Sequence, residues 1–146
     1  IYKTDKTRKS KMEEIHIWIS SRDYENSNMM ILLGYIISSH PDWKNVKIKV
    51  FSIYPNQGEF ENYKTRMFSF IESGRLPISP LNLKMIPQNE HSGIKSIINK
   101  HSEKADLTII GFRSEVVKKQ KLAAFEGYEE LGNILFVNSL KGKEIE

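Results

Sequence analysis

Apolar residues along the chain fall into short stretches of two kinds, one with the two-residue period of strands and one with the spacing of helices. The first stretch, residues 15–19, has isoleucine at every second position, with His16 and Trp18 between them. Because apolar or aromatic side chains then point to both faces, this stretch predicts a central strand of a sheet that is covered on both sides.

The next apolar stretch, residues 29–37, has the spacing of a helix. Asn26 or Ser27 is placed to cap this helix, and Pro41 ends it because the residue before a proline disfavours helical geometry. A second strand, residues 46–54, follows after a turn. The apolar residues of the helix are Met29, Leu32, Leu33, Ile36 and Ile37.

The same alternation of strand and helix continues to the end of the chain. Residues 81–85 are the predicted third strand. One of its faces is polar, which favours a position at the edge of the sheet. We expect Asn89 or Ser92 to cap the helix that comes after it. The remaining predicted elements are helices at 60–71, 94–101 and 122–131, and strands at 107–112 and 134–137.

Strict alternation of strands and helices favours a parallel sheet with helices on both faces. We therefore predict a three-layer α/β fold of the Rossmann-like kind. Its five-stranded parallel sheet has the order 3-2-1-4-5, so the first and fourth strands are central neighbours.

Composition fits one folded domain, since hydrophobic residues make up 39% of the 146 residues and charged residues 27%. The longest apolar run, residues 29–33, is far shorter than the roughly 20 residues that span a bilayer. Residues 1–14 are polar and charged without a sustained period. We expect them to form a basic linker, residues 15–140 to form the domain, and residues 141–146 to form a tail.

The net charge is +4, and much of the excess lies near the N-terminus. A basic cluster can bind nucleic acid or anionic lipid, or it can be a solvated tail, which is the commonest case. We expect no nucleic-acid partner and keep anionic lipid as an alternative to the solvated tail. The cluster comprises Lys3, Lys6, Arg8, Lys9 and Lys11, with Arg22 nearby.

A ligand on such a sheet would lie beyond the carboxyl ends of the first and fourth strands, where the strand order reverses. The two loops there are residues 20–27 and 111–115. Their arginines and the nearby helix N-termini could hold an anion. The alternative is that these are ordinary solvated loops that cap helices. The candidate residues are Ser21, Arg22, Asp23, Gly111, Arg113 and Ser114.

Motifs of catalysis and cofactor binding are missing from the sequence. It contains neither of the glycine-rich phosphate loops, no nucleophile elbow and no cysteine, and its four histidines lack metal-ligand spacing. We therefore expect no metal, no cofactor and no enzymatic activity.

Three segments together resemble the C-terminal domain of the cation-chloride cotransporters. The first joins residues 15–18 (Ile-His-Ile-Trp) to the helix at 28–37, the second runs from His40 through Trp43 to the strand at 46–50, and the third is 105–113. His16 stands where the family has an acidic residue, and Gly34 where it has alanine. The resemblance extends over most of the chain from residue 15 to residue 137.

The resemblance implies a universal-stress-protein-like fold and a cytosolic domain that follows the last transmembrane helix. It also implies a role in regulation and dimerisation, with the ion-binding residues in the membrane part. Basic residues at the N-terminus fit a cytoplasmic segment near the membrane. We expect a homodimer in the full-length protein, and aromatic side chains left outside the fold, such as Tyr54, Tyr63 or Phe112, are candidates for its contact.

Two alternatives stay open. A stand-alone nucleotide-binding stress protein would share the fold, but such a protein has a second glycine where Ser114 stands. A small enzyme on the same sheet would need a catalytic set that the sequence does not offer.

Overall fold

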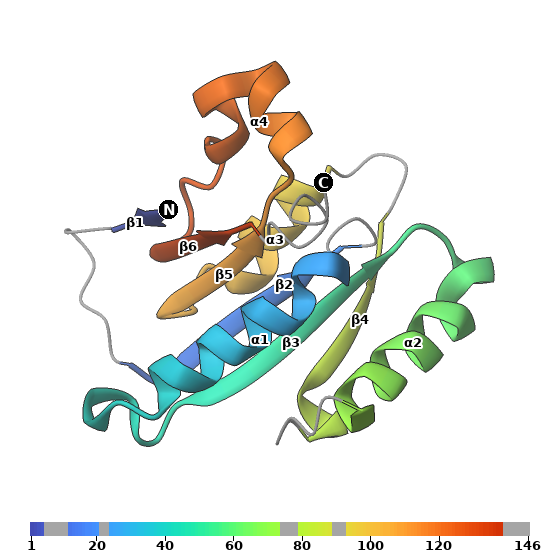
Figure 1. Ribbon diagram of the computed structural model, residues 1–146, viewed down its shortest axis with the longest axis horizontal. Helices are drawn as coiled ribbons and strands as arrows, with labels where there is room; N and C mark the ends of the chain where they lie inside the picture. The colour runs from blue at the N-terminus through green and yellow to red at the C-terminus, as the bar shows by residue number, and fades with distance from the viewer. Residues whose placement is uncertain (5–11, 21–23, 74–78, 89–92, 139–146) are drawn as a thin grey trace, which may run out of the picture.

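A six-stranded mixed sheet forms the centre of the computed structural model, which describes residues 1–4, 12–20, 24–73, 79–88 and 93–138. The strand order is β1-β6-β5-β2-β3-β4 (Figure 1). Five strands pair in parallel, in the order that the sequence predicts, with the first and fourth of them as central neighbours. They are β2 (Glu14–Ile19), β3 (Lys47–Tyr54), β4 (Leu83–Pro87), β5 (Leu107–Gly111) and β6 (Asn133–Val137).

The sixth strand corrects the predicted strand count. Strand β1 (Tyr2–Lys3) pairs antiparallel with β6, in a stretch that we expected to be a linker. The backbone nitrogen of Ile1 donates to the carbonyl oxygen of Phe136 at 3.0 Å. A two-residue strand carries no periodic pattern, so pattern reasoning could not find it.

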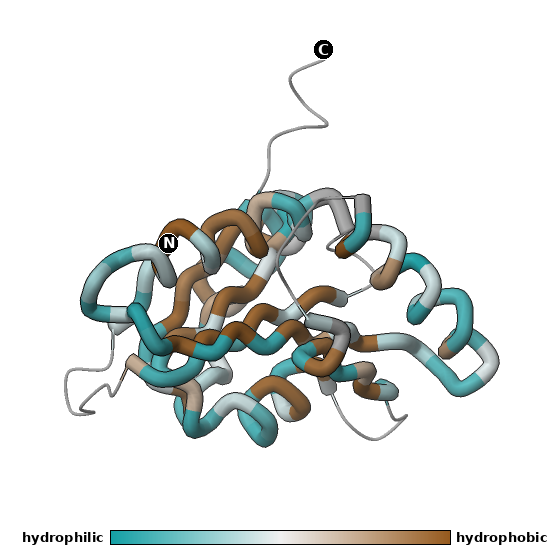
Figure 2. Tube along the Cα trace, turned by 90° about the horizontal axis from the view of Figure 1, so that it is seen from below, coloured by the Kyte–Doolittle hydropathy of each residue, from teal (hydrophilic) through white to brown (hydrophobic). Residues whose placement is uncertain are grey.

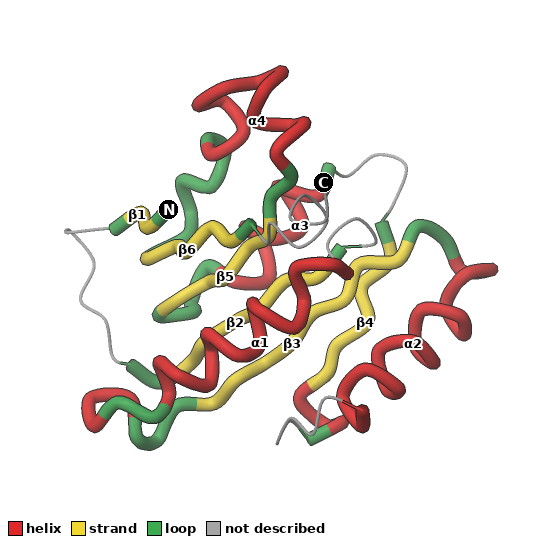
Figure 3. The backbone as a smooth tube through the Cα atoms, in the orientation of Figure 1, coloured by secondary structure: helices red, strands yellow, loops and turns green. Residues whose placement is uncertain are grey.

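Helices cover both faces of the sheet (Figures 1 and 3). One face carries α1 (Tyr24–Ser38) and α2 (Phe60–Ser73), and the other carries α3 (Ile94–Ser102). Helix α4 (Ser114–Gln120) follows β5. Short 3-10 turns complete the structure: η1 (Pro41–Trp43), η2 (Gln57–Glu59), η3 (Pro80–Asn82) and η4 (Lys121–Phe125).

Alternation along β2 divides the core into two clusters. Ile15, Ile17 and Ile19 pack against α1 and α2, whereas Trp18 packs against α3. Figure 2 shows the result as a largely hydrophobic sheet layer between layers of mixed character. A sheet whose strands are apolar on both faces requires such a covering layer on each side.

Several predicted details are wrong. Helix α1 begins at Tyr24, so Asn26 and Ser27 lie inside it and are buried rather than acting as caps. The N-cap of α3 is Gly93, while the predicted caps lie outside the described residues. Strand β4 begins only at Leu83, since Leu81 belongs to η3.

The fourth helix is the largest local error. Residues 114–120 form α4, ahead of the predicted range, and Tyr128 lies after η4 in a non-helical segment. Leu122 is exposed rather than core-facing. One of the aromatic residues expected outside the fold, Tyr54, is buried, while Tyr63 and Phe112 are partly buried.

Candidate functional site

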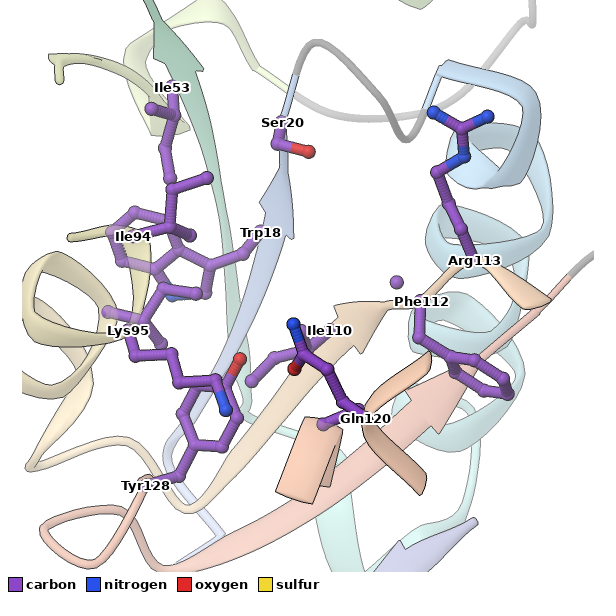
Figure 4. Close-up of a pocket in the computed structure, with 13 residues that line it drawn as sticks. Trp18, Ser20, Ile53, Ile94, Lys95, Ile110, Phe112, Arg113, Gln120 and Tyr128 are labelled. Carbon is purple, nitrogen blue, oxygen red and sulfur yellow. The ribbon is translucent and has the colours of Figure 1, made fainter. Parts of the chain in front are cut away.

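A pocket of about 250 Å³ opens at the carboxyl ends of β2 and β5, where the strand order reverses. Figure 4 shows it between α3 on one side and the segment after β5 on the other. Its walls are mainly apolar. Residues that line it include Trp18, Ser20, Ile53, Ile98, Ile110 and Tyr128.

Only part of the predicted anion site lies at this pocket. Gly111 ends β5 and lines the pocket together with Arg113. However, Figure 4 shows the guanidinium of Arg113 turned away from Trp18 and Tyr128, and its Nε lies 3.3 Å from the Glu115 carboxylate. The positive charge is thus paired at the protein surface.

The other predicted residues do not extend this site within the described part of the chain. Ser114 begins α4, and its hydroxyl accepts a hydrogen bond from the Asn138 side chain at 2.9 Å. Ser21, Arg22 and Asp23 lie outside the described residues. The proposed anion contact therefore stays a prediction.

Lys95, which the sequence did not single out, is a second cationic residue that lines the pocket. Its Nζ donates to the carbonyl oxygens of Ala123 at 3.1 Å and Glu126 at 2.6 Å. The same ammonium lies 5.2 Å from the centre of the Tyr128 ring, within the range of a cation–π contact. These contacts hold the segment after α4 against α3. No sequence motif predicts them, because they join residues about 30 positions apart.

A second group of polar side chains is sealed under α3. Trp18 Nε1 donates to the Ser102 hydroxyl at 2.7 Å, and the same hydroxyl lies 2.7 Å from His16 Nδ1. An indole N–H can only donate, so Ser102 accepts from Trp18, and its hydroxyl also shares a hydrogen bond with His16 Nδ1.

Charges surround this histidine. Glu14 Oε1 lies 3.7 Å from His16 Nε2, too far for a hydrogen bond, and 2.6 Å from Lys49 Nζ. The hydrogen bond from Lys49 lowers the pKa of Glu14 below its usual range. Burial lowers the pKa of His16, although the Glu14 charge partly opposes this shift. Asp106 accepts the backbone N–H groups of Glu13 and Glu14 at 2.7 and 2.9 Å.

Serine, histidine and carboxylate are also the residue types of a catalytic triad. Here Ser102 is 0% exposed and His16 is also buried, so both side chains lie out of reach of solvent. The group instead connects β2 to the end of α3. Within the described ranges, three or more histidine, aspartate or glutamate side chains nowhere converge to form a metal site.

Among the described helices, none combines the length and hydrophobicity that a membrane crossing needs. Residues 3–126 match the model of solute carrier family 12. A comparison with curated protein sequences found no match.

One solved structure with a similar fold is a universal stress protein in complex with cAMP. The TM-score is 0.50 at 11% sequence identity, and the match covers 84% of this chain and 95% of that one. At this identity the likeness concerns the fold alone, and it agrees with the predicted universal-stress-protein-like architecture.

Proposed function

Because the chain belongs to solute carrier family 12, the cation-chloride cotransporter family, we propose that it is the cytoplasmic regulatory and dimerisation domain of such a transporter. The observation that carries this proposal is the family match, which runs from β1 to the end of η4 and so includes most of the α/β unit. The domain works beside the membrane part of the same protein, where the transported ions bind.

The charge of the N-terminal stretch supports a position at the cytoplasmic face. Short cytoplasmic segments beside membrane helices are enriched in lysine and arginine, and a basic cluster is attracted to anionic headgroups. Lys3 lies in β1, and the rest of the cluster lies outside the described residues. We propose a contact with anionic lipid through Lys3, Lys6, Arg8, Lys9 and Lys11.

We propose a non-catalytic role for the domain, and the chemistry of the two polar sites supports this proposal. In the core, Ser102 and His16 are inaccessible to a substrate. At the pocket, the Lys95 ammonium is bound by two backbone carbonyls, which reduces its ability to hold a phosphate. The alternative of a stand-alone nucleotide-binding stress protein is therefore less favoured.

The test uses the intact transporter in membranes, with and without this domain. We expect deletion to lower both the cross-linked dimer fraction and the chloride-dependent cation flux, normalised to the amount of protein at the membrane. An unchanged dimer fraction together with an unchanged flux would disprove the proposed role.

A further inference from the structure

Helix α1 carries an apolar stripe on the side that faces away from the sheet. Met29, Leu32 and Ile36 are 44%, 53% and 57% exposed, while Met30 and Ile31 on the opposite side are fully buried. Their spacing of three and four residues places the exposed side chains on one helix face, over a length of about 10 Å. Surface helices usually have polar residues at such positions.

The stripe also lacks charge. Between residues 26 and 39 the sequence contains no charged residue. On α2, which lies on the same face of the sheet, Glu61 and Arg66 are exposed. A helix that is apolar on nearly every side is typical of a helix buried on every side, which indicates that another surface covers α1.

We propose that this stripe is the surface through which the domain contacts the α1 stripe of a second copy, with the two helices antiparallel about a two-fold axis. The inference rests on the proposed role in dimerisation and assigns that role to one surface. A two-fold contact brings the same patch together twice. With Leu32 near the axis, Leu32 faces Leu32 of the partner subunit, and Met29 faces Ile36 of the partner subunit.

The absence of charge on the stripe favours a second copy over other partners. A patch without charge meets its own copy without like-charge repulsion, although each chain carries a net charge of +4. An amphipathic helix that lies on a membrane usually has lysine or arginine beside its apolar face, and residues 26–39 contain neither.

The size of the stripe sets the strength of the contact. Three half-exposed aliphatic side chains supply far less than the roughly 800 Å² per partner that a stable free-standing interface buries. Two domains that belong to one membrane dimer meet at high effective concentration, where a weak contact suffices. The stripe therefore suits tethered domains better than free ones.

Charge reversal at Leu32 tests the contact in the intact transporter. Leu32→Glu and Leu32→Lys, expressed separately, each place like charges across the axis, so we expect contact between the domains to fall about tenfold or more. Expressed together, the two variants should regain it, since the mixed pair brings opposite charges together. Leu32 is half exposed, so neither change removes a core contact.

A disulfide assay measures this contact directly, because residues 1–146 contain no cysteine. Leu32→Cys should cross-link two copies faster than Leu81→Cys or Leu122→Cys, although those controls are 87% and 75% exposed. For the charge variants, the contact is measured as the rate of disulfide formation between Ile36→Cys on one copy and Met29→Cys on the other. A Leu32→Cys rate no higher than the controls, or no recovery in the mixed charge pair, would overturn the assignment.

The results separate this inference from the role on which it rests. If deletion of the domain lowers the dimer fraction but Leu32→Cys does not cross-link, the domain dimerises through another surface. If Leu32→Lys strengthens binding to anionic vesicles while Leu32→Glu weakens it, the stripe lies on lipid and the inference is wrong. If deletion changes nothing, the proposed function itself fails.

Discussion

The two faces of the sheet are built from different chemistry, although both bury the same strands. On the α1 and α2 face the hydrophobic cluster is aliphatic apart from two methionines, and the buried polar residues Asn26 and Ser27 lie in the first turn of α1. On the α3 face the core is rich in aromatic rings, and it encloses His16, Ser102 and Thr108 as buried polar residues. Strand β2 supplies both faces, through alternate residues.

This difference separates two ways of fixing a helix on a sheet. An aliphatic contact is non-directional, so α1 depends mainly on shape and buried area, and the Asn26 side chain adds a hydrogen bond to the Phe112 carbonyl oxygen at 3.2 Å. The hydroxyl of Ser102 meets both Trp18 and His16, so α3 is also fixed by hydrogen bonds with a definite geometry. The α3 face, which buries a histidine and a shared serine hydroxyl, should therefore respond to pH and to the loss of a single oxygen atom.

Truncation of the aromatic core should have the largest effect. Trp18 is buried, and its ring stacks on Phe51 with centroids 4.4 Å apart. Trp18→Ala leaves a cavity and frees the Ser102 hydroxyl, so we expect a loss of about 3–5 kcal/mol in the free energy of unfolding, measured by urea denaturation. Leu122→Ala, at an exposed site, is the control and should change stability by less than about 0.5 kcal/mol. Similar losses in both variants would contradict the assigned core.

The second-largest loss of stability is expected when the Ser102 hydroxyl is removed. Ser102→Ala leaves the buried indole N–H of Trp18 and Nδ1 of His16 without their shared partner. We expect a loss of about 1–3 kcal/mol, the usual penalty for an unsatisfied buried polar group. Ser96→Ala on the exposed side of α3 is the matched control and should be neutral or slightly stabilising, because alanine favours helices. Equal effects at the two serines would refute the hydrogen-bond assignment.

The order of the parallel strands was predictable because it follows from local patterns. Residues 15–19 and 107–112 are apolar on both faces, which only central strands of a covered sheet require. The short connections and their fixed handedness then leave few topologies. The helix after β5 was placed too late because Leu122 and Tyr128 suggest helical spacing, whereas the chain leaves the helix at Lys121, whose φ is +53°.

The sequence did not predict which side chains meet in the pocket and in the buried polar group. Lys95 and Tyr128 meet only because the segment after η4 folds back onto α3, and Ser102 meets His16 across 86 positions of the chain. Such contacts depend on how the helices pack, which no local pattern encodes. Arg113 was found in sequence, but its pairing with Glu115 depends on side-chain direction.

Acidification should weaken the polar face selectively. Burial lowers the pKa of His16, so the unfolded chain takes up a proton below its usual value near 6.5 while the folded chain resists it. Stability is therefore complete above about pH 6.5 and decreases as the pH falls below that value. Urea denaturation at pH 7.5 and 5.5 should show lower stability at the lower pH. Glu14 acts in a separate window, because its pKa lies below the usual carboxylate range.

Two histidine variants separate the contributions to this pH effect. His16→Gln should remove the larger part of it, since glutamine does not titrate. His40→Gln, at an exposed histidine beside η1, is the comparison variant and should retain the larger part of the pH effect. The pKa of His101 is also lowered by burial, so a smaller residual effect is expected. A pH dependence that is the same with and without His16 would contradict the assignment.

The smallest expected effect tests how tightly α1 approaches the aliphatic face. A Cβ atom at Gly34 would lie 2.9 Å from Cδ1 of Ile17, which is the flexible end of that side chain. Alanine gains about 1 kcal/mol of helix propensity over glycine, and the shift of Ile17 offsets this gain. Gly34→Ala should therefore change the free energy of unfolding by less than about 1 kcal/mol. Gly34→Leu is the contrasting variant, and it should destabilise by about 1–3 kcal/mol because a whole side chain cannot fit between α1 and β2. Equal stability of the two variants would show that α1 is held more loosely than its contacts with β2 indicate.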